Sequence, residues 1–380
     1  MSTMRSADDR SFVALASDPA RSRTLPGYLY SDPKVLDEER RRIFFKSWQL
    51  VGHVSEVAQA GDYVTADIAG QSVFVIREKS GKLSAFFNVC QHRAHELLAG
   101  KGNVKAAIVC PYHAWVYEFD GTLRKARATV RMPEFDPYEY SLVPVRLEEM
   151  LGFLFVNLDP ESKPLTELVP DMIADMRATM PWIGDLVINR EGDRSGDEFG
   201  RLQANWKVLA ENCLECYHCG PAHQAFTDLV DIDQYACSVY TRWIKSHGEV
   251  NNLQNSAYNV PADAPVRVNS YWHMWPNIEF GLFPGNRTLS AFSFGPGTAE
   301  ETRTSSWMLT MPGEPLPKER IDYVRNVLWP EDEGICRSVH RGLKSLGYRQ
   351  GRFVMDPQAP GLSENAVHGF QRMYAGEMGL

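Results

Sequence analysis

The sequence predicts an α+β protein of two domains, a small β domain followed by a larger domain of antiparallel strands and long helices. The chain has 380 residues, of which 44% are hydrophobic, so it can form two cores of ordinary size. From Gly61, apolar residues recur with a period of two, and turn residues stand at Ala69-Gly70 and Ser80-Gly81. After Leu165, segments with helical spacing alternate with strand-like segments.

The first domain is expected after an N-terminal arm of residues 1–30. Ser31-Asp32-Pro33 combines an N-cap candidate with a proline in the first turn, which predicts a helix that ends near Lys46. Strands are expected from Leu50, and the β domain should close near Asp159-Pro160, after the strand Phe153–Asn157. The predicted division is therefore 1–30, 31–160 and 161–380.

The second domain is expected to begin with two helices, at 165–180 and 203–219, the latter stopped by Gly220 and Pro221. A long helix over 317–346, interrupted at Pro330, should end the strand-rich part. The strand-like segments between these helices are 239–245, 268–283, 288–294 and 304–311.

Charge and cysteine content narrow the class of protein. The net charge of −8, without a long basic cluster, argues against a nucleic-acid partner. No apolar run is long enough to cross a bilayer, and residues 1–31 show no apolar secretory run. Seven cysteines, an odd number, favour a reducing compartment over a disulfide framework, so we expect a cytoplasmic protein.

The most informative feature is a set of four metal-ligating residues, Cys90, His92, Cys110 and His113. Two thiolates and two imidazoles can hold a structural zinc ion or a [2Fe–2S] cluster. Zinc ribbons and fingers pair Cys with Cys and His with His, whereas each half of this set pairs one Cys with one His. The order therefore favours the two-iron cluster.

With its flanking residues, this set resembles the Rieske domain of Rieske non-haem iron oxygenases, the ring-hydroxylating dioxygenase family. The resemblance extends to Asn88-Val89 before the ligands and to Trp115, Tyr117 and Asp120-Gly121 after them. It implies that the two cysteines bind one iron and the two histidines the other, and that the second domain is a helix-grip-like catalytic domain. Three residues depart from the usual Arg, Gly and Gly of the family without being ligands: Gln91, Ala94 and Ala114.

A second metal site is predicted around His218 and His223. Two histidines at a helix end and in the following loop can converge on one metal, although they could also be unrelated. The resemblance implies mononuclear Fe(II) here, with a third ligand from the acidic pair Glu331-Asp332. Asp332 matches best and Glu331 is the fallback, while helix-dipole complementarity would explain either acid without a metal.

The run Cys213-x-x-Cys216-x-x-Cys219 lies next to these histidines. A four-iron cluster would need a fourth cysteine at position 223, where this chain has a histidine. We therefore expect these three cysteines to be packed as small apolar side chains.

The resemblance also implies a ring of three α subunits, or a multiple of three, in which a carboxylate joins a cluster histidine to an iron histidine of the neighbouring subunit. That position is Glu215, for which the alternative is an ordinary helix-surface acid. The usual residue is Asp, and the form Glu215-Cys-Tyr-His-Cys is similar to the branch that demethylates quaternary ammonium compounds.

Function follows from the resemblance. Because no Gly-x-Gly-x-x-Gly follows a strand, two electrons would come from NAD(P)H through a separate flavin/ferredoxin-type reductase, with O2 as cosubstrate. The expected reaction is oxidative N-demethylation of a small betaine or quaternary amine, by monooxygenation rather than dioxygenation. Alternatives are hydroxylation or O-demethylation of an aromatic acid and, in another class, a non-enzymatic electron carrier or zinc-binding interaction module.

The region between 226 and 315 is rich in aromatic residues, which could form a cation–π cage for an N-methylated ligand. For most of them we favour an ordinary core role, because they fall at strand spacing. The residues in question are Tyr258, Tyr271, Trp272, Trp275, Phe280, Phe283, Phe292 and Phe294.

Overall fold

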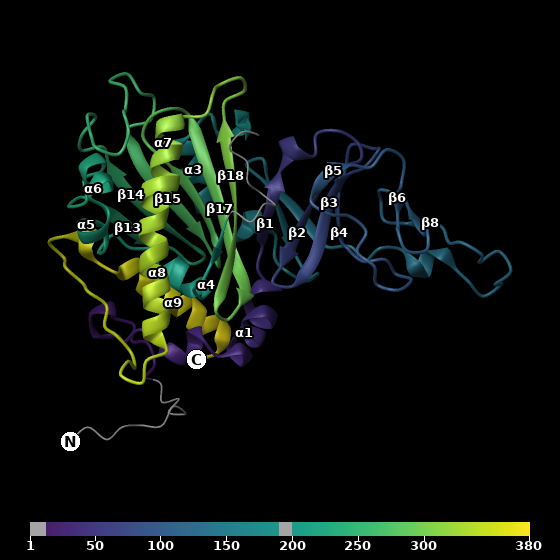
Figure 1. Ribbon diagram of the computed structural model, residues 1–380, viewed down its shortest axis with the longest axis horizontal. Coiled ribbons are helices and arrows are strands. Elements are labelled where there is room, and N and C mark those ends of the chain that lie inside the picture. Colours follow the sequence, from purple (N-terminus) through teal and green to yellow (C-terminus); the bar gives the residue numbers. More distant parts are fainter. Residues whose placement is uncertain (1–12, 190–199) are drawn as a thin grey trace. The chain divides into compact units, whose positions relative to one another are not determined.

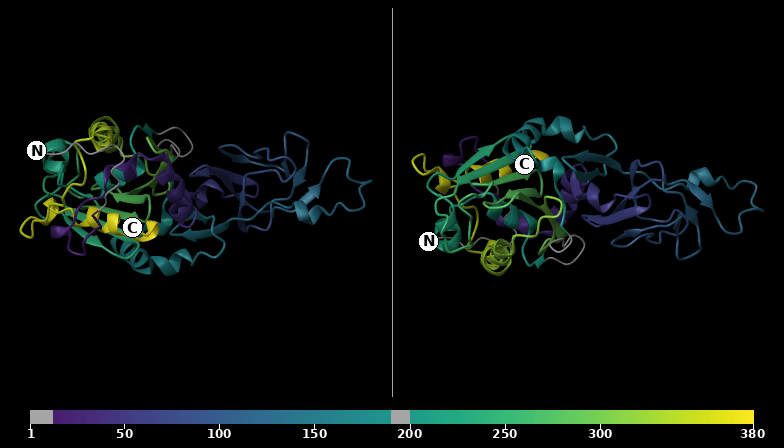
Figure 2. Two further views of the ribbon diagram at one scale, coloured as in Figure 1. Left: turned by 90° about the horizontal axis from the view of Figure 1, so that it is seen from below. Right: turned by 90° about the horizontal axis from the view of Figure 1, so that it is seen from above.

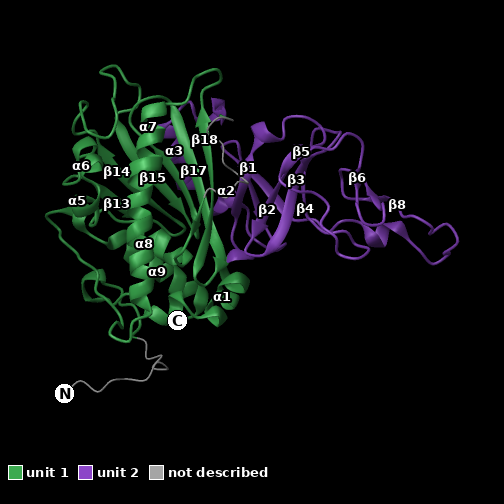
Figure 3. Cartoon of the chain, in the orientation of Figure 1, with its two compact units in different colours: residues 1–43, 189–193, 198–380 green, residues 44–188, 194–197 purple. Residues whose placement is uncertain are grey.

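The computed structural model describes residues 13–189 and 200–380, and the chain divides into two compact units (Figure 3). Unit 1 comprises residues 1–43, 189–193 and 198–380, and unit 2 comprises residues 44–188 and 194–197. These boundaries differ from those expected at residues 30 and 160. Helix α1 (Pro33–Glu39) belongs to unit 1 because its last residue, Glu39, is buried there and accepts hydrogen bonds from Trp206 and Tyr374.

Within its described residues, unit 2 contains three antiparallel sheets, with the strand orders β4-β3-β2-β5, β1-β10-β9 and β6-β7-β8. Its first five strands are β1 (Gln49–His53), β2 (Asp62–Ile68), β3 (Gln71–Arg77), β4 (Leu83–Phe87) and β5 (Lys101–Asn103). The remaining elements are β6 (Ile108–Val109), β7 (Val116–Tyr117), β8 (Leu123–Lys125), β9 (Arg146–Met150), β10 (Phe153–Asn157), α2 (Leu165–Leu168), α3 (Pro170–Thr179) and β11 (Val187–Ile188).

The predicted β-hairpin in unit 2 is confirmed. Ala69 and Gly70 both have positive φ, 50° and 95°, as a two-residue turn between antiparallel strands requires. Gly81 also has positive φ, between β3 and β4. The turn residues therefore fix the register of the strands that they connect.

Unit 1 is built on one large antiparallel sheet in which the strand order is β18-β17-β16-β15-β14-β13, with β12 pairing with β18. Helices α7 and α8 lie end to end along one side of this sheet (Figures 1 and 2). The strands are β12 (Arg201–Leu202), β13 (Ala236–Val239), β14 (Trp243–Glu249), β15 (Val268–Met274), β16 (Ile278–Leu282), β17 (Thr288–Thr298) and β18 (Glu301–Thr310). Besides α1, the helices are α4 (Trp206–Cys213), α5 (Cys219–Ala222), α6 (Gln224–Leu229), α7 (Lys318–Tyr323), α8 (Trp329–Leu343) and α9 (Asn365–Met378).

Several predicted segments are divided more finely than expected. Pro170 starts a second helix, so 165–180 forms α2 and α3. The segment 239–245 contains the turn between β13 and β14, and 268–283 contains two strands that turn at Trp275-Pro276. In each case a proline or a short turn divides a segment that was predicted as a single element.

The long predicted helix is present, but its pitch changes in the segment just before Pro330. Residues Val324–Leu328 form a π-helical segment between α7 and α8. A proline has no N–H to donate to the carbonyl four residues earlier, so the backbone around it adopts a wider turn. The interruption was predicted at Pro330 itself and lies one turn before it.

The described residues, 13–189 and 200–380, include no helix that is both long and apolar enough to span a membrane.

Glu211 on α4 should make stability depend on pH. It is partly buried and accepts hydrogen bonds from Tyr30 (2.6 Å) and Gln371 (2.8 Å), and burial raises its pKa to about 7. The native state therefore keeps a proton that the unfolded chain releases at lower pH, so stability falls as the pH rises from about 4.5 to about 7. We expect Glu211→Gln to stabilise the protein by about 1 to 2 kcal/mol at pH 8.

Urea unfolding of Glu211→Gln and wild type at pH 5.5 and pH 8 checks this prediction. The gain should be smaller at pH 5.5, because Glu211 is then already protonated in the native state. An equal change at both pH values would show that ionisation of Glu211 has no part in it.

Candidate active site

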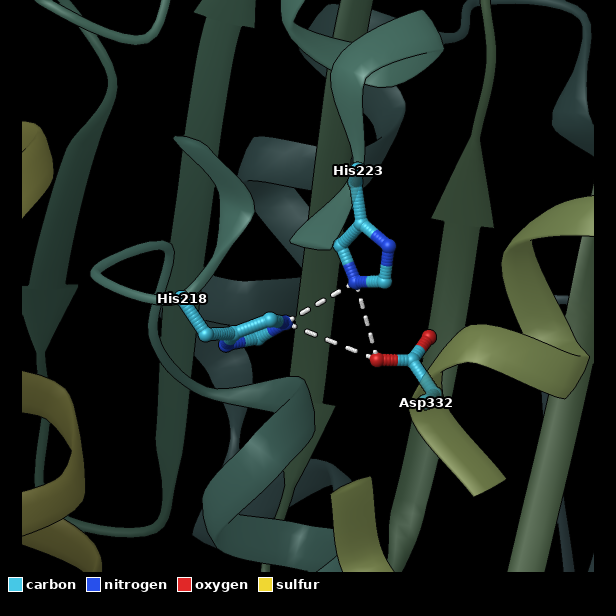
Figure 4. A group of neighbouring side chains, drawn as sticks. All are labelled: His218, His223 and Asp332. Atoms are coloured by element: carbon cyan, nitrogen blue, oxygen red, sulfur yellow. Dashed lines mark hydrogen bonds and ion pairs between the residues drawn. The ribbon is translucent and has the colours of Figure 1, made fainter. Parts of the chain in front are cut away.

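Three side chains of unit 1 converge on one point (Figure 4). His223 Nε2 lies 3.0 Å from both His218 Nε2 and Asp332 Oδ1, and His218 Nε2 lies 3.5 Å from the same Asp332 oxygen. His223 is 98% buried in side chain, whereas His218 and Asp332 keep about a fifth of theirs exposed. Two imidazole nitrogens and one carboxylate oxygen on one face form the ligand set that suits mononuclear iron and leaves other positions open.

The second nitrogen of each imidazole is held by a carboxylate. His218 Nδ1 donates to Glu215 Oε1 at 2.5 Å, and His223 Nδ1 donates to Glu331 Oε2 at 2.8 Å. Since a carboxylate can only accept, both rings present an unprotonated Nε2 to the common point in their neutral form. Glu331, the fallback third ligand, thus lies behind His223, and Asp332 supplies the oxygen at the centre.

The pKa values of the three groups show that this point favours positive charge. Burial lowers the pKa of His218, but hydrogen bonds to Asp332 and Glu215 outweigh it and raise the value to about 9. Burial also lowers the pKa of His223, but hydrogen bonds to Asp332 and Glu331 outweigh this effect and raise the pKa above its ordinary value. Burial raises the pKa of Asp332, but its contacts with the two histidines bring it below the ordinary value.

The local fold that presents His218 differs from the expected one. Helix α4 ends at Cys213, rather than at residue 219, and Leu214 is its C-cap. Glu215 Oε2 then accepts the backbone N–H of His218 at 3.0 Å, so this side chain stabilises a turn that a continuing helix would replace. Pro221 lies inside the first turn of the short helix α5 instead of stopping α4.

In unit 2, the four predicted cluster residues lie on two loops of the same conformation. Ala94 donates its N–H to the Cys90 carbonyl and Ala114 to the Cys110 carbonyl, both at 3.0 Å. The two alanines have φ of 55° and 58°, the left-handed region in which the family usually has glycine. Each loop therefore turns its Cys inward and its His outward in the same way.

The side chains of these loops suit a two-iron cluster. Both cysteines are only 2% exposed, and the Tyr117 hydroxyl lies 3.3 Å from Cys90 Sγ. The rings of His92 and His113 lie 4.6 Å apart near the surface. His113 Nδ1 is buried and has no hydrogen-bond partner among the described residues, which leaves its lone pair for a metal.

Two protein-family models match the sequence. "Rieske [2Fe-2S] domain" matches residues 47–136, and "Ring hydroxylating alpha subunit (catalytic domain)" matches residues 188–379, half of the chain. The chain belongs to the ring-hydroxylating α-subunit family of Rieske oxygenases. This oxygenase therefore uses a Rieske [2Fe–2S] cluster, mononuclear iron and O2, and takes electrons that come from NAD(P)H through a reductase. The zinc-module and electron-carrier alternatives are wrong.

Relatives of this oxygenase are named for quaternary ammonium substrates. The carnitine monooxygenase oxygenase subunit of Acinetobacter pittii (strain PHEA-2) is 37% identical over 363 residues, which cover 94% of this chain and 96% of the relative. The chloroplastic choline monooxygenase of Beta vulgaris is 29% identical, with 89% and 74% covered. A solved quaternary ammonium Rieske monooxygenase has a TM-score of 0.87 at 34% identity and covers 96% of this chain and 97% of its own.

A cavity of about 220 Å³ lies beside the three converging residues of this oxygenase, between the sheet and helices α4, α7 and α8. Of the eight aromatic candidates, Tyr271, Phe283 and Phe292 line it. The other five are buried elsewhere, so the core role favoured for most of them is confirmed. Phe226, Tyr235, Trp307 and Trp329, which sequence analysis did not single out, complete its aromatic lining.

The cysteines next to the site are not all packed thiols. Cys216 and Cys219 form a disulfide, with Cα atoms 4.8 Å apart, so the expectation of three packed thiols is wrong for this pair. The turn that Glu215 stabilises brings residues at i and i+3 within disulfide range, which sequence spacing alone did not indicate. Cys213 remains a free thiol, and all three line the cavity.

Proposed function

We propose that this oxygenase hydroxylates an N-methyl carbon of a small quaternary ammonium compound, with His218, His223 and Asp332 as the ligands of its mononuclear iron. The observation that carries the proposal is the convergence of these three ligand atoms within 3.5 Å beside an aromatic cavity. Carnitine and choline, for which the relatives are named, share a trimethylammonium group. Aromatic faces attract such cations.

In the same proposal, Cys90 and Cys110 hold one iron of the Rieske cluster, and His92 and His113 hold the other. The bound cluster and mononuclear iron supply the electrons and the O2 chemistry. The protein contributes orientation: Glu215 and Glu331 fix the two imidazole rings, and the cavity walls position the substrate. A separate flavin/ferredoxin-type reductase in the cytoplasm would be the electron source.

We further propose that Glu215 is the bridging residue of a trimer. Its Oε1 already accepts the Nδ1–H of His218, and it keeps 14% of its side chain exposed. A carboxylate has further lone pairs, so it can also accept from the cluster residue His113 of a neighbouring subunit. Electrons would then pass between subunits across one side chain.

Glu215→Gln is expected to leave both metal sites loaded while slowing electron transfer to the iron by about 10-fold to 100-fold. The amide keeps one accepting oxygen but loses the charge that polarises the His218 ring. Rapid mixing of the reduced variant with O2 and substrate, followed at the cluster absorption, measures this rate. Cluster oxidation as fast as in wild type would assign Glu215 a purely structural role.

The carbon that is hydroxylated decides the products. Two electrons and two protons reduce O2 so that one oxygen enters the C–H bond and the other leaves as water. A hydroxymethyl group on the ammonium nitrogen then loses its proton; the C–N bond breaks, the nitrogen keeps the electron pair, and formaldehyde is released. Hydroxylation of the chain carbon next to nitrogen would instead release trimethylamine and leave an aldehyde.

A single-turnover assay tests the proposal. Chemically reduced, iron-loaded protein is mixed with O2 and with carnitine, choline, betaines or substituted benzoates, and formaldehyde, trimethylamine and hydroxylated products are counted. We expect one formaldehyde per turnover from an N-methylated cation. Trimethylamine would move the reaction to the chain carbon, and product from the benzoates alone would refute the substrate class.

A further inference from the structure

Besides the His218–His223–Asp332 group and its carboxylate partners, the cavity contains two charged side chains that make no hydrogen-bonded ion pair with any described residue: Arg320 on α7 and Glu279 on β16. Arg325 also lines the cavity but is already engaged in another contact. A buried charge is costly unless it is paired. A ligand with a negatively charged group for Arg320 and a positively charged group for Glu279 would therefore stabilise both residues.

Arg320 is a buried cation without an anion. It is 4% exposed, its Nη2 donates to the Met308 thioether at 3.5 Å, and its guanidinium lies 5.7 Å from the centre of the Phe283 ring. Within the described part of the chain, no carboxylate lies within 4.0 Å of its nitrogens. A thioether is a weak acceptor, so most of the guanidinium donors remain for a ligand.

Glu279 provides the opposite charge. It is 9% exposed, and its Oε2 is buried without a hydrogen-bond partner among the described residues. Its one ion-pair contact in that part of the chain is His273 Nδ1 at 3.9 Å, which is beyond hydrogen-bond distance. Burial raises the pKa of Glu279, and the nearby His273 offsets only part of this effect.

The strand register separates the two charges. Glu279 on β16 pairs with Phe292 on β17, and Phe292 packs on Trp329, which lies two residues before the acidic pair of α8. Arg320 instead packs on Phe283, four residues further along from Glu279, which is about 13 Å at strand rise. The cavity therefore has an acidic, aromatic end near the iron ligands and a basic end away from them.

We propose that Arg320 binds a carboxylate at the far end of the substrate while Glu279 and the adjacent aromatic rings bind its ammonium group. The protein would thus select zwitterionic quaternary ammonium acids over alcohols with the same cation. This inference rests on the proposed function and adds the residues that decide the substrate class. Guanidinium binds carboxylate in a bidentate geometry that an alcohol cannot use.

Binding measured without reductant separates this inference from turnover. Isothermal titration of the iron-loaded protein uses 4-(trimethylammonio)butanoate and 4-(trimethylammonio)butan-1-ol, which have the same cation and chain length. We expect wild type to bind the acid about 100-fold more tightly than the alcohol, as buried charge pairs typically require. Equal affinities in wild type would overturn the proposal without any variant.

Arg320→Met removes the charge and supplies a side chain that suits the neighbouring Met308. It should reduce the acid-to-alcohol affinity ratio from about 100 to about 3 or less, while Arg320→Lys retains a ratio of about 10 because the charge remains and the fork is lost. Glu279→Gln should weaken both ligands together and leave the ratio near its wild-type value. A ratio preserved in Arg320→Met would overturn the proposal.

Lys318→Met is the matched control, since Lys318 is an exposed cation of the same helix that pairs with Asp322. It should leave the ratio as in wild type, and a fall in Lys318→Met equal to that in Arg320→Met would assign the effect to overall charge. Iron content and thermal melting verify that each variant is folded. Normal zwitterion selectivity with no product from any cation would contradict the proposed reaction and leave the recognition site standing.

Discussion

Asp332→Ala should lose its mononuclear iron and, with it, all detectable single-turnover product. The carboxylate oxygen of Asp332 lies 3.0 Å from His223 Nε2 and would complete the proposed three-ligand face. Replacing a residue behind a metal ligand costs 10-fold to 100-fold in metal affinity, so removing the ligand itself should cost more. The four residues proposed to hold the cluster lie in unit 2, and the absorption of the Rieske cluster should therefore persist.

Glu331→Gln is the matched control for this prediction. Glu331 precedes Asp332 on the same helix, but its Oε2 accepts from the outer nitrogen of His223. An amide can still accept there, so we expect iron to remain bound with activity reduced by about 10-fold to 100-fold. Iron analysis per protein, together with product counts, distinguishes the two acids. Loss of iron only in Glu331→Gln would reverse their roles.

Lys207→Met is expected to destabilise the protein by about 3 to 5 kcal/mol, because it leaves a buried carboxylate without its counter-charge. Lys207 and Glu39 are both completely buried, and Nζ lies 2.5 Å from Oε1. The rings of Tyr30, Trp206 and Tyr374 surround the ammonium at 5.1 to 5.2 Å. These aromatic faces stabilise the ammonium of Lys207. Once Lys207 is replaced, they cannot neutralise the charge of Glu39.

Urea unfolding of Lys207→Met and of the double variant Lys207→Met/Glu39→Gln measures this cost. The amide oxygen at position 39 can still accept from Trp206, the amide NH2 can donate to the Tyr374 hydroxyl oxygen, and the side chain carries no charge. The double variant should therefore recover more than half of the lost stability. A loss below about 1 kcal/mol in the single variant would mean that the pair contributes no more than an exposed ion pair.

Local signals in the sequence were sufficient wherever a few adjacent residues decide the structure. The Ala69-Gly70 turn needs only its own backbone geometry, and the two Cys/His loops hydrogen-bond to themselves. The convergence of His218, His223 and Asp332 followed from family resemblance, because residues more than 100 positions apart leave no local trace of their meeting.

Elements that depend on distant contacts were harder to predict. Helix α4 ends at Cys213 because the Glu215 side chain caps the next turn, and the Cys216–Cys219 disulfide forms on that turn. Helix α9 (Asn365–Met378) has no counterpart among the predicted elements, and Gly369 and Gly376 reduce its helical propensity. Its buried face, including Phe370 and Tyr374, supplies the stabilisation that propensity does not.

The π-helical segment Val324–Leu328 determines which way the cavity-facing residues point. Arg320, Val324, Leu328 and Asp332 all line the cavity, each four residues after the last. In a straight α-helix, three such steps would carry the side chains about 120° around the axis. A π turn holds more residues and rotates each four-residue step in the opposite sense, so the stripe stays in phase from Arg320 to Asp332. Deleting one residue between 324 and 328 would place Arg320 and Asp332 eleven residues apart in a regular α-helix, about 20° from full turns, so both ends of the stripe would still face the cavity and only the wide turn would be lost.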